Sequence, residues 1–459
     1  MHAIARRRVT LEPDAAAPPR APSLREALRY WLHLGCISFG GPAGQIAIMH
    51  RELVEQRRWI SEGRFLHALN YCMVLPGPEA QQLATYIGWL MHRTAGGVAA
   101  GALFVLPSLV VLSALSWLYV TYGNVPLVAA ALYGVKPAVV AIVLHAAWRI
   151  GTRALRHPLL WMLAAAAFLA SFAFNVPFPV IVLSAGVAGA IGGKLVPAAF
   201  ARKAARADAR HPTGRALIDD DTPTPSHARF STARLARVVT VSLALWATGL
   251  GALIALQGTD GTLVRMGTFF TKAALLGFGG AYAVLPYVYQ GAVETFGWVT
   301  PAQMIDGLAL GETTPGPLMM IVAFVGYVGA QGHAQAGAHV GLAAGIAGAC
   351  VATFFTFLPS FFFILAGGPL VERTHGQARF VAPLTGITAA VVGVIVNLAM
   401  FFALHVFWPN GALRAQPDYV AVIVGIAAAL ALFRLRVGVI PVIAGAAALG
   451  AVARFTGLA

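Results

Sequence analysis

Charge is scarce in this chain of 459 residues, because only 11% of the residues are Asp, Glu, Lys or Arg. A soluble domain carries about 25%, so the chain lacks the polar surface that would keep a 48 kDa core in water. Apolar stretches of about 17–30 residues recur from position 28 onwards, each long enough for about 30 Å of hydrocarbon. Membrane β-barrels use alternating segments of about 10 residues instead. The sequence therefore predicts an all-α polytopic membrane protein.

Cysteine and cofactor motifs are also rare. The three cysteines, Cys36, Cys72 and Cys350, are dispersed and form no Cys-x-x-Cys pair, which excludes a disulfide framework and a zinc site of that type. The chain has no GxxxxGK[ST] phosphate loop, no His-x-x-x-His pair and no dinucleotide fingerprint in a strand–turn–helix context. We therefore expect no metal, no cofactor and no enzymatic activity.

Acidic residues are outnumbered by basic ones, and the formal net charge is +15. In a soluble protein this excess indicates nucleic-acid binding. Here many arginines stand in short loops beside apolar stretches, where the positive-inside rule places them. The lipid bilayer, and no nucleic acid, is the expected partner. Residues 1–23 are rich in Arg, Pro and Ala without an apolar run, and we interpret them as a disordered cytoplasmic tail.

The chain contains two copies of one unit. Aligning 39–78 with 278–317, at a constant offset of 239, gives ten identities in forty positions. After an insertion around 331–340 the offset becomes 252, and it pairs Leu-Pro-Ser at 106–108 with Leu-Pro-Ser at 358–360. Internal repeats of this kind are frequent in secondary transporters.

Hydrophobicity divides the chain into six apolar stretches, one unpaired stretch and six more. They lie at about 29–48, 65–91, 97–119, 127–148, 159–175 and 177–194, then 236–257, then 267–289, 304–330, 338–366, 381–406, 419–433 and 438–456. The predicted domains are a first transporter repeat at 24–198, a polar and mobile cytoplasmic linker at 199–235, a connecting transmembrane helix at 236–262 and a second repeat at 263–459. The unpaired stretch makes the second copy enter the membrane from the opposite side.

Arginine placement supports this inversion independently. The loop at 49–64 carries four arginines, whereas its counterpart at 288–303 has no Lys or Arg. The loop at 149–156 carries three, and its counterpart at 401–408 has none. Complementary basic loops are what inverted-topology repeats require. We expect the N-terminus on the cytoplasmic side.

Prolines and glycines interrupt two apolar stretches in each copy. Pro-Gly-Pro stands at 76–78 and, in the same register, at 315–317, while Gly-Gly stands at 40–41 and 279–280. These residues forbid a regular helix, and broken helices that enter and return on the same side would also place the 49–64 arginines inside. Irregular backbone at membrane depth is tolerated where it is buried in protein or lines a wet cavity. Four half-helix ends would leave free amide N–H groups and positive dipole ends, which suit an anion.

Several polar residues accompany the breaks. Lys136 and Lys272 are the clearest cations inside apolar stretches, where charge is costly and marks function, although each could pair structurally or reach the interface. Glu79 and Glu312 flank the two Pro-Gly-Pro breaks at non-equivalent positions, and either a coupling role or a capping role is open for them. The residues expected to bind an anion are Gly40, Gly41, Gln45, Asn70, Pro76, Gly77, Pro78, Lys136, Lys272, Gly279, Gly280, Thr313, Thr314, Pro315, Gly316 and Pro317.

Three segments of the first copy resemble the chromate ion transporter (CHR) family in its long two-domain form. They are FGGPAGQIA at 39–47, ELVEQRRWIS at 52–61 and NYCMVLPGPEAQQLATY at 70–86, and FGGAYAVLPY at 278–287 and GETTPGPL at 311–318 resemble it in the second copy. The resemblance covers about 25–455. It implies an inner-membrane exporter that removes cytoplasmic chromate, driven by the membrane potential or a proton gradient, and confers chromate resistance.

Two alternatives remain open at this stage. Chromate and sulfate are both tetrahedral dianions, so a transporter or channel for sulfate or another small oxyanion fits the same residues. A membrane enzyme or assembly factor without transport activity is the other reading, and the duplicated breaks argue against it. The sequence also leaves the oligomeric state open, including a homodimer.

Overall fold

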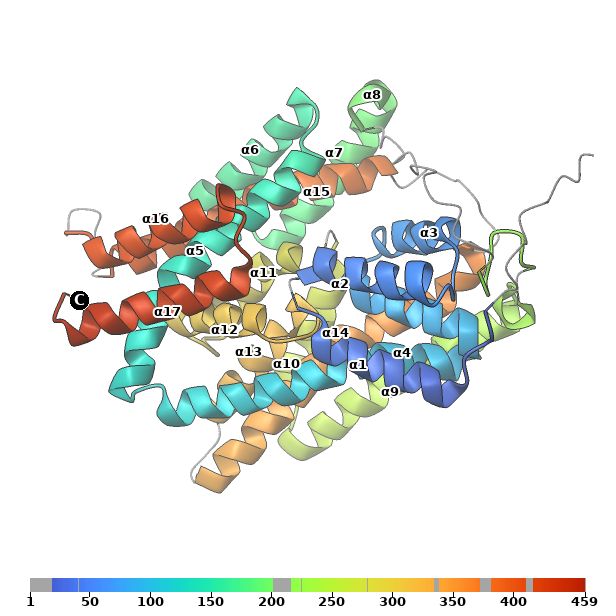
Figure 1. Cartoon of the computed structure of the whole chain (residues 1–459), viewed down its shortest axis with the longest axis horizontal. Helices are drawn as coiled ribbons and strands as arrows, with labels where there is room; N and C mark the ends of the chain where they lie inside the picture. Colours follow the sequence, from blue (N-terminus) through green and yellow to red (C-terminus); the bar gives the residue numbers. More distant parts are fainter. Residues whose placement is uncertain are drawn as a thin grey trace, which may run out of the picture.

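The computed structural model is helical throughout the part of the chain that it describes (Figure 1). The described residues are 19–39, 41–200, 216–223, 225–278, 280–333, 338–371, 381–409 and 416–458. Six helices are long and apolar enough to cross a membrane by length and composition. The chain is a multi-span helical membrane protein, as its sequence predicts.

The first copy follows the predicted stretches and their interruptions. Its elements are α1 (Leu24–Ile37), α2 (Gly41–His50), the π-helix η1 (Arg51–Gln56), α3 (Glu62–Cys72), α4 (Glu79–Tyr122), α5 (Pro126–Ala154), α6 (Pro158–Phe174), α7 (Phe178–Leu195) and the short α8 (Pro197–Phe200). The stretch predicted at 65–91 ends as α3 before the Pro-Gly-Pro break and resumes as α4 after it. One feature was not predicted: α4 joins two stretches through a kink at His92 and Arg93, where Arg93 has a φ of 58°.

The second copy is interrupted at the corresponding places. After the 3₁₀ turn η2 (Ser226–Ala228) and the connecting helix α9 (Thr232–Gln257), its elements are α10 (Thr262–Leu276), α11 (Ala281–Tyr289), the π-helix η3 (Gln290–Thr295), α12 (Pro301–Thr313), the 3₁₀ turn η4 (Leu318–Met320), α13 (Ile321–Gly332), α14 (Ala338–Val371), α15 (Val381–Phe407), α16 (Tyr419–Phe433) and α17 (Val439–Phe455). Helix α9 packs on α10 and α14 and buries none of its residues fully.

The two copies share unusual backbone features at the offset of 239. The π-helices η1 and η3 occupy equivalent positions, and the helix that follows each one starts with a side-chain cap, from Ser61 and from Thr300. Three pairs of equivalent residues have a positive φ: Gly41 and Gly280, Arg58 and Gly297, and Gly77 and Gly316. The repeat found in the sequence is thus a repeat of the structure.

The copies interlock rather than lie side by side as separate units. Helix α5 of the first copy packs on α16 and α17 of the second, and α15 packs on α6 and α7 (Figure 1). Glycines permit these crossings: a Cβ on Gly134 would lie 2.1 Å from the carbonyl oxygen of Ala446, and one on Gly386 would lie 2.5 Å from that of Ala185. Small residues allow such close backbone approach between membrane helices.

The described part of the linker is docked, which corrects the expectation that it is mobile. Ile218 forms an isolated β-bridge with Ile60, and the Ser61 hydroxyl donates to Asp220 Oδ1 at 2.8 Å. Arg64 donates to the Thr222 carbonyl oxygen at 2.5 Å. Acidic and apolar linker residues thus bind the arginine-rich loop of the first copy.

Candidate functional site

The two Pro-Gly-Pro breaks adopt the same backbone conformation. The first joins α3 to α4, with Pro78 as the N-cap residue of α4. The second joins α12 to η4, with Pro317 as the N-cap residue of η4. Gly77 has a φ of 116° and Gly316 a φ of 103°, a region that glycine enters without steric cost. The backbone therefore requires glycine here, and the prolines prevent a continuous helix.

Each break is hydrogen-bonded to the other copy. The Gly77 N–H donates to the Gly277 carbonyl oxygen at 3.0 Å, and the Gly316 N–H donates to the Ser38 carbonyl oxygen at 2.8 Å. The same offset of 239 relates the two donors and the two acceptors. The N–H groups of Gly77 and Gly316 are therefore occupied, and the amides that the half-helix ends leave free are those of the first helical turns.

Two fully buried glutamines brace the breaks. Gln45 Nε2 donates to the Gly316 carbonyl oxygen at 2.5 Å and to that of Ser38 at 3.3 Å. Gln82 Nε2 donates to the Pro76 carbonyl oxygen at 2.7 Å. Gln45, an expected site residue of the first copy, thus lies against the break of the second copy.

The glutamates that flank the breaks both approach the start of α11. A Cβ on Gly280, the N-cap residue of α11, would lie 3.4 Å from Glu79 Oε1. Glu312 is 5% exposed and accepts a hydrogen bond from the hydroxyl of Tyr282, which is in the first turn of α11. A carboxylate at a helix N-terminus is stabilised by the helix dipole, typically by about 0.3–1 kcal/mol. Glu79 and Glu312 come from different copies, and both carboxylates lie near the N-terminus of α11.

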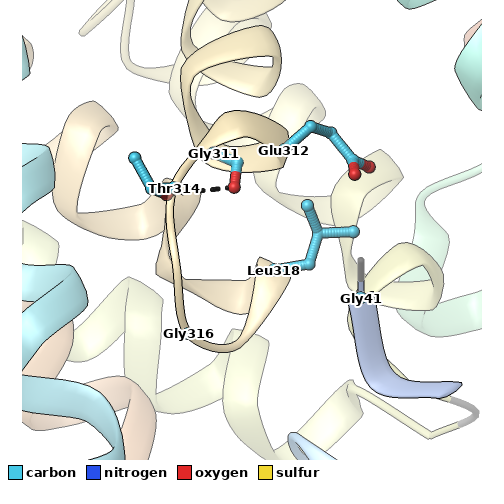
Figure 2. Close-up of a pocket in the computed structure, with 6 residues that line it drawn as sticks. All are labelled: Gly41, Gly311, Glu312, Thr314, Gly316 and Leu318. Carbon is cyan, nitrogen blue, oxygen red and sulfur yellow. Dashed lines mark hydrogen bonds between the residues drawn. The ribbon is translucent and has the colours of Figure 1, made fainter. Parts of the chain in front are cut away.

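A small pocket lies at the second break. Its lining residues are Gly41, Gly311, Glu312, Thr314, Gly316 and Leu318. Figure 2 shows Glu312 and Leu318 on the side that faces Gly41, with Thr314 on the opposite side. The Thr314 hydroxyl donates to the Gly311 carbonyl oxygen at 3.1 Å, and the Thr313 hydroxyl donates to that of Leu310 at 3.0 Å. The pocket has no room for a water molecule in this conformation.

Lys136 is paired across the two copies. Its Nζ lies 3.7 Å from Asp306 Oδ2, and the Tyr119 hydroxyl donates to the same oxygen at 2.9 Å. Asp306 is 2% exposed, and its Oδ1 has no hydrogen-bond partner within the described ranges. A buried carboxylate needs a cation or hydrogen-bond donors nearby, because an unpaired charge is costly in a protein interior. Lys136 therefore neutralises Asp306.

Two of the remaining expected residues are among those that the structure describes, and two are not. Asn70 of α3 and Lys272 of α10 are exposed, and neither forms a hydrogen bond or ion pair with the described residues. Gly40 and Gly279 are outside the described residues. No three His, Cys, Asp or Glu side chains gather as a metal site in the part of the chain that the structure describes.

The sequence is similar to proteins of a known family. A family model described as chromate transporter matches residues 25–190 and 264–451, more than half of the chain. The chain belongs to the chromate transporter family. Its relatives include the chromate transport protein of Pseudomonas aeruginosa, 34% identical over 83% of this chain and 81% of the relative. The chromate transport protein of Cupriavidus metallidurans is 29% identical over 83% of both chains. No solved structure gives a significant match.

Membership makes this chain a transporter-family protein and not an enzyme. Four buried residues that lie at or between the breaks and the ion pair were not predicted as site candidates from the sequence of this chromate transporter family member. They are Gln82, Ser108, Asp306 and Ser360. An acidic residue inside the apolar stretch at 304–330, which also contains Glu312, was the available signal for Asp306. The repeated Leu-Pro-Ser was the signal for the two serines.

The pairing of Lys136 with Asp306 predicts non-additive stability. Lys136→Met alone should destabilise the protein by about 3–5 kcal/mol, because it leaves the buried Asp306 carboxylate uncompensated. Asp306→Asn alone should destabilise it by less, because the Lys136 side chain is 29% exposed. The double variant should lose less than the sum of the two single losses. Thermal unfolding in detergent measures this, with Lys272→Met as a control expected within about 0.5 kcal/mol of wild type. Additive losses would contradict the pairing.

Proposed function

We propose that this chain is a secondary transporter that exports chromate from the cytoplasm across the inner (plasma) membrane and thereby confers chromate resistance. Family membership supports chromate as the substrate. The observation that carries the mechanism is the pair of equivalent breaks, each held by a backbone hydrogen bond to the other copy. Chromate is a tetrahedral dianion, and its binding needs converging hydrogen-bond donors but no nucleophile, metal or nucleotide.

The anion site is proposed at the breaks. Helices α2, α4 and α11 start there, and the dipoles of helix starts favour an anion. The first backbone bond of α4 runs from Gln82 N–H to the Pro78 carbonyl oxygen, so the first-turn amides precede it. The residues proposed to form the site within the described chain, either as its frame or as its donors, are Gly41, Gln45, Pro76, Gly77, Pro78, Gly280, Thr313, Thr314, Pro315, Gly316 and Pro317. Relative motion of the copies would open the narrow pocket at Gly316.

The copies are proposed to have inverted topology, with re-entrant helices around the breaks and a cytoplasmic N-terminus. The single connecting helix α9, the complementary arginine loops and the reciprocal hydrogen bonds support this arrangement. Inverted repeats place a substrate site between them near the bilayer midplane. In this orientation the linker is cytoplasmic, as is the arginine-rich loop on which it docks.

Glu79 is proposed to couple anion binding to protons or to conformation. Its carboxylate lies at the starts of both α4 and α11, where a bound anion would also be stabilised. A dianion about 5 Å away would repel an ionised carboxylate by roughly 6–7 kcal/mol at an effective dielectric constant of 20. Glu79 would therefore turn away or take up a proton when the anion arrives.

Export should depend on the breaks themselves. Pro76→Ala together with Pro315→Ala should lower chromate export by about tenfold or more, because each substitution favours continuous helix by about 3 kcal/mol. The assay is chromate flux in proteoliposomes that contain only this protein, with labelled sulfate as competitor. Pro441→Ala, at an exposed position of α17, is the matched control. Normal flux in a folded double variant would refute the break mechanism, and preferred transport of sulfate would reassign the substrate.

Inverted topology predicts which cysteines a membrane-impermeant reagent can reach. In a background without the three native cysteines, a cysteine replacing Arg57 or Asp221 should react only from the cytoplasmic side. A cysteine replacing Thr300, the second-copy counterpart of Ser61 in the same loop as Arg57, should react from outside. Labelling of positions 57 and 300 from the same side would rule out the inversion.

The coupling role of Glu79 predicts a change in pH dependence. Glu79→Gln removes the charge but preserves size and hydrogen bonding, so chromate should bind equally or more tightly. The pH dependence of transport should weaken, because one proton-binding group is lost. Flux measured across a pH series tests this, with Glu26→Gln in the exposed first turn of α1 as the control. Unchanged rate and pH dependence would leave Glu79 as a helix cap.

A further inference from the structure

Two buried serines occupy equivalent positions in the two copies. Ser108 of α4 and Ser360 of α14 are related by the offset of 252, and each follows a Leu-Pro pair. Ser108 is 0% exposed and Ser360 is 1% exposed. Neither hydroxyl has a hydrogen-bond partner among the residues that the structure describes. The fold therefore buries the same unpaired hydroxyl twice.

Each serine touches the Pro-Gly-Pro break of the other copy. A Cβ on Gly77 would lie 2.5 Å from Ser360 Oγ, and a Cβ on Gly316 would lie 2.6 Å from Ser108 Cβ and 3.0 Å from its Oγ. Any residue larger than glycine would displace the serine. Both hydroxyls are thus held beside the loops from which α4 and η4 start.

Close packing explains a small residue at these positions but not a hydroxyl. Alanine would fill the same space without burying a polar group, and an unsatisfied buried hydroxyl costs free energy. Some hydroxyls on the same helices are satisfied locally: Ser116 donates to the Leu112 carbonyl oxygen and Thr356 to that of Ala352, both at 2.6 Å. The Thr353 hydroxyl of α14 also lacks a partner among the described residues. What distinguishes Ser108 and Ser360 is that they recur at equivalent positions beside the two breaks, which points to a shared ligand.

We propose that Ser108 and Ser360 donate hydrogen bonds to the transported oxyanion and complete two equivalent subsites. Each subsite combines the break of one copy with the serine of the other. A serine hydroxyl rotates to suit its acceptor, and a bond from it to an anionic oxygen is short and strong. At the first subsite, Gln82 Nε2 would lie 2.9 Å from a Cβ on Gly77 and adds a second donor. This inference rests on the proposed function, because it names donors of that site.

The test is chromate binding and transport by Ser108→Ala and Ser360→Ala. Each should weaken binding of chromate to the purified full-length protein by about tenfold to a hundredfold, which corresponds to one hydrogen bond to a charged group. Titration calorimetry measures Kd, and vesicle flux should show the change in KM. Ser116→Ala and Thr356→Val are matched controls, expected to leave both values unchanged. Ser108→Cys and Ser360→Cys, with a weaker donor of similar size, should give intermediate values.

The outcomes separate this inference from the proposed function. Wild-type binding of chromate or sulfate, with weakened binding in both serine variants and unchanged Tm, supports the subsites. If the wild-type protein binds chromate or sulfate and the alanine variants bind it equally well, the serines are packing residues and the proposed subsites are wrong, while the proposed function stands. A wild-type protein that binds neither anion would overturn the proposed function and the subsites together.

Discussion

The constraint on which the structure depends is the satisfaction of backbone polar groups where a helix is interrupted within a membrane protein. An N–H or C=O group that lacks a partner in hydrocarbon costs several kcal/mol. Here the Gly77 amide finds the Gly277 carbonyl and the Gly316 amide finds the Ser38 carbonyl. Each copy supplies what the other lacks. Neither copy could adopt its break alone without leaving an amide and a carbonyl unsatisfied. The packing of α5 on α17 and of α15 on α7 also joins the two copies.

Side chains depart from this symmetry where charge is placed. Glu79 corresponds to Leu318 and Glu312 to Met73, while Asp306 corresponds to His67 at the same offset of 239. A symmetric backbone by itself would give two equivalent conformations equal energies. In the proposed transport cycle, carboxylates at non-equivalent positions would make the two conformations differ in charge environment. In the proposed function this difference is what links the direction of movement to the anion and to protons.

Much of the helical architecture could be predicted because it follows from local chemistry. Proline and glycine at 76–78 and 315–317 set the breaks, and apolar length set the helices. The kink at Arg93 could not be predicted, since a non-glycine residue with a φ of 58° is imposed by packing. Docking of Ile218 and Asp220 on the first copy depends on contacts far apart in sequence.

The candidate site was predictable in part for the same reason. The repeated motif located the breaks, and intramembrane charge located Lys136. Pairing of Lys136 with Asp306, and of Gln45 with Gly316, joins residues that are 170 or more positions apart. Such partners follow from how the copies interlock, which no local pattern encodes. The serines appeared in the alignment of the copies, but only their unpaired hydroxyls distinguish them from packing residues.

The backbone N–H and C=O groups at the first break are largely satisfied within the protein, which limits the donors that are left for an anion. Pro76 and Pro78 have no N–H, so Gly77 carries the only amide of the three residues, and it is bonded to Gly277. The Pro76 carbonyl oxygen accepts a hydrogen bond from Gln82 Nε2, and the Pro78 carbonyl oxygen accepts one from the backbone N–H of Gln82. The break is therefore nearly self-sufficient and can persist without a ligand. In the proposed function, an anion would then be held by first-turn amides and side-chain donors beside the break, and the Pro-Gly-Pro motif would act as the rigid frame of the site rather than as its set of donors.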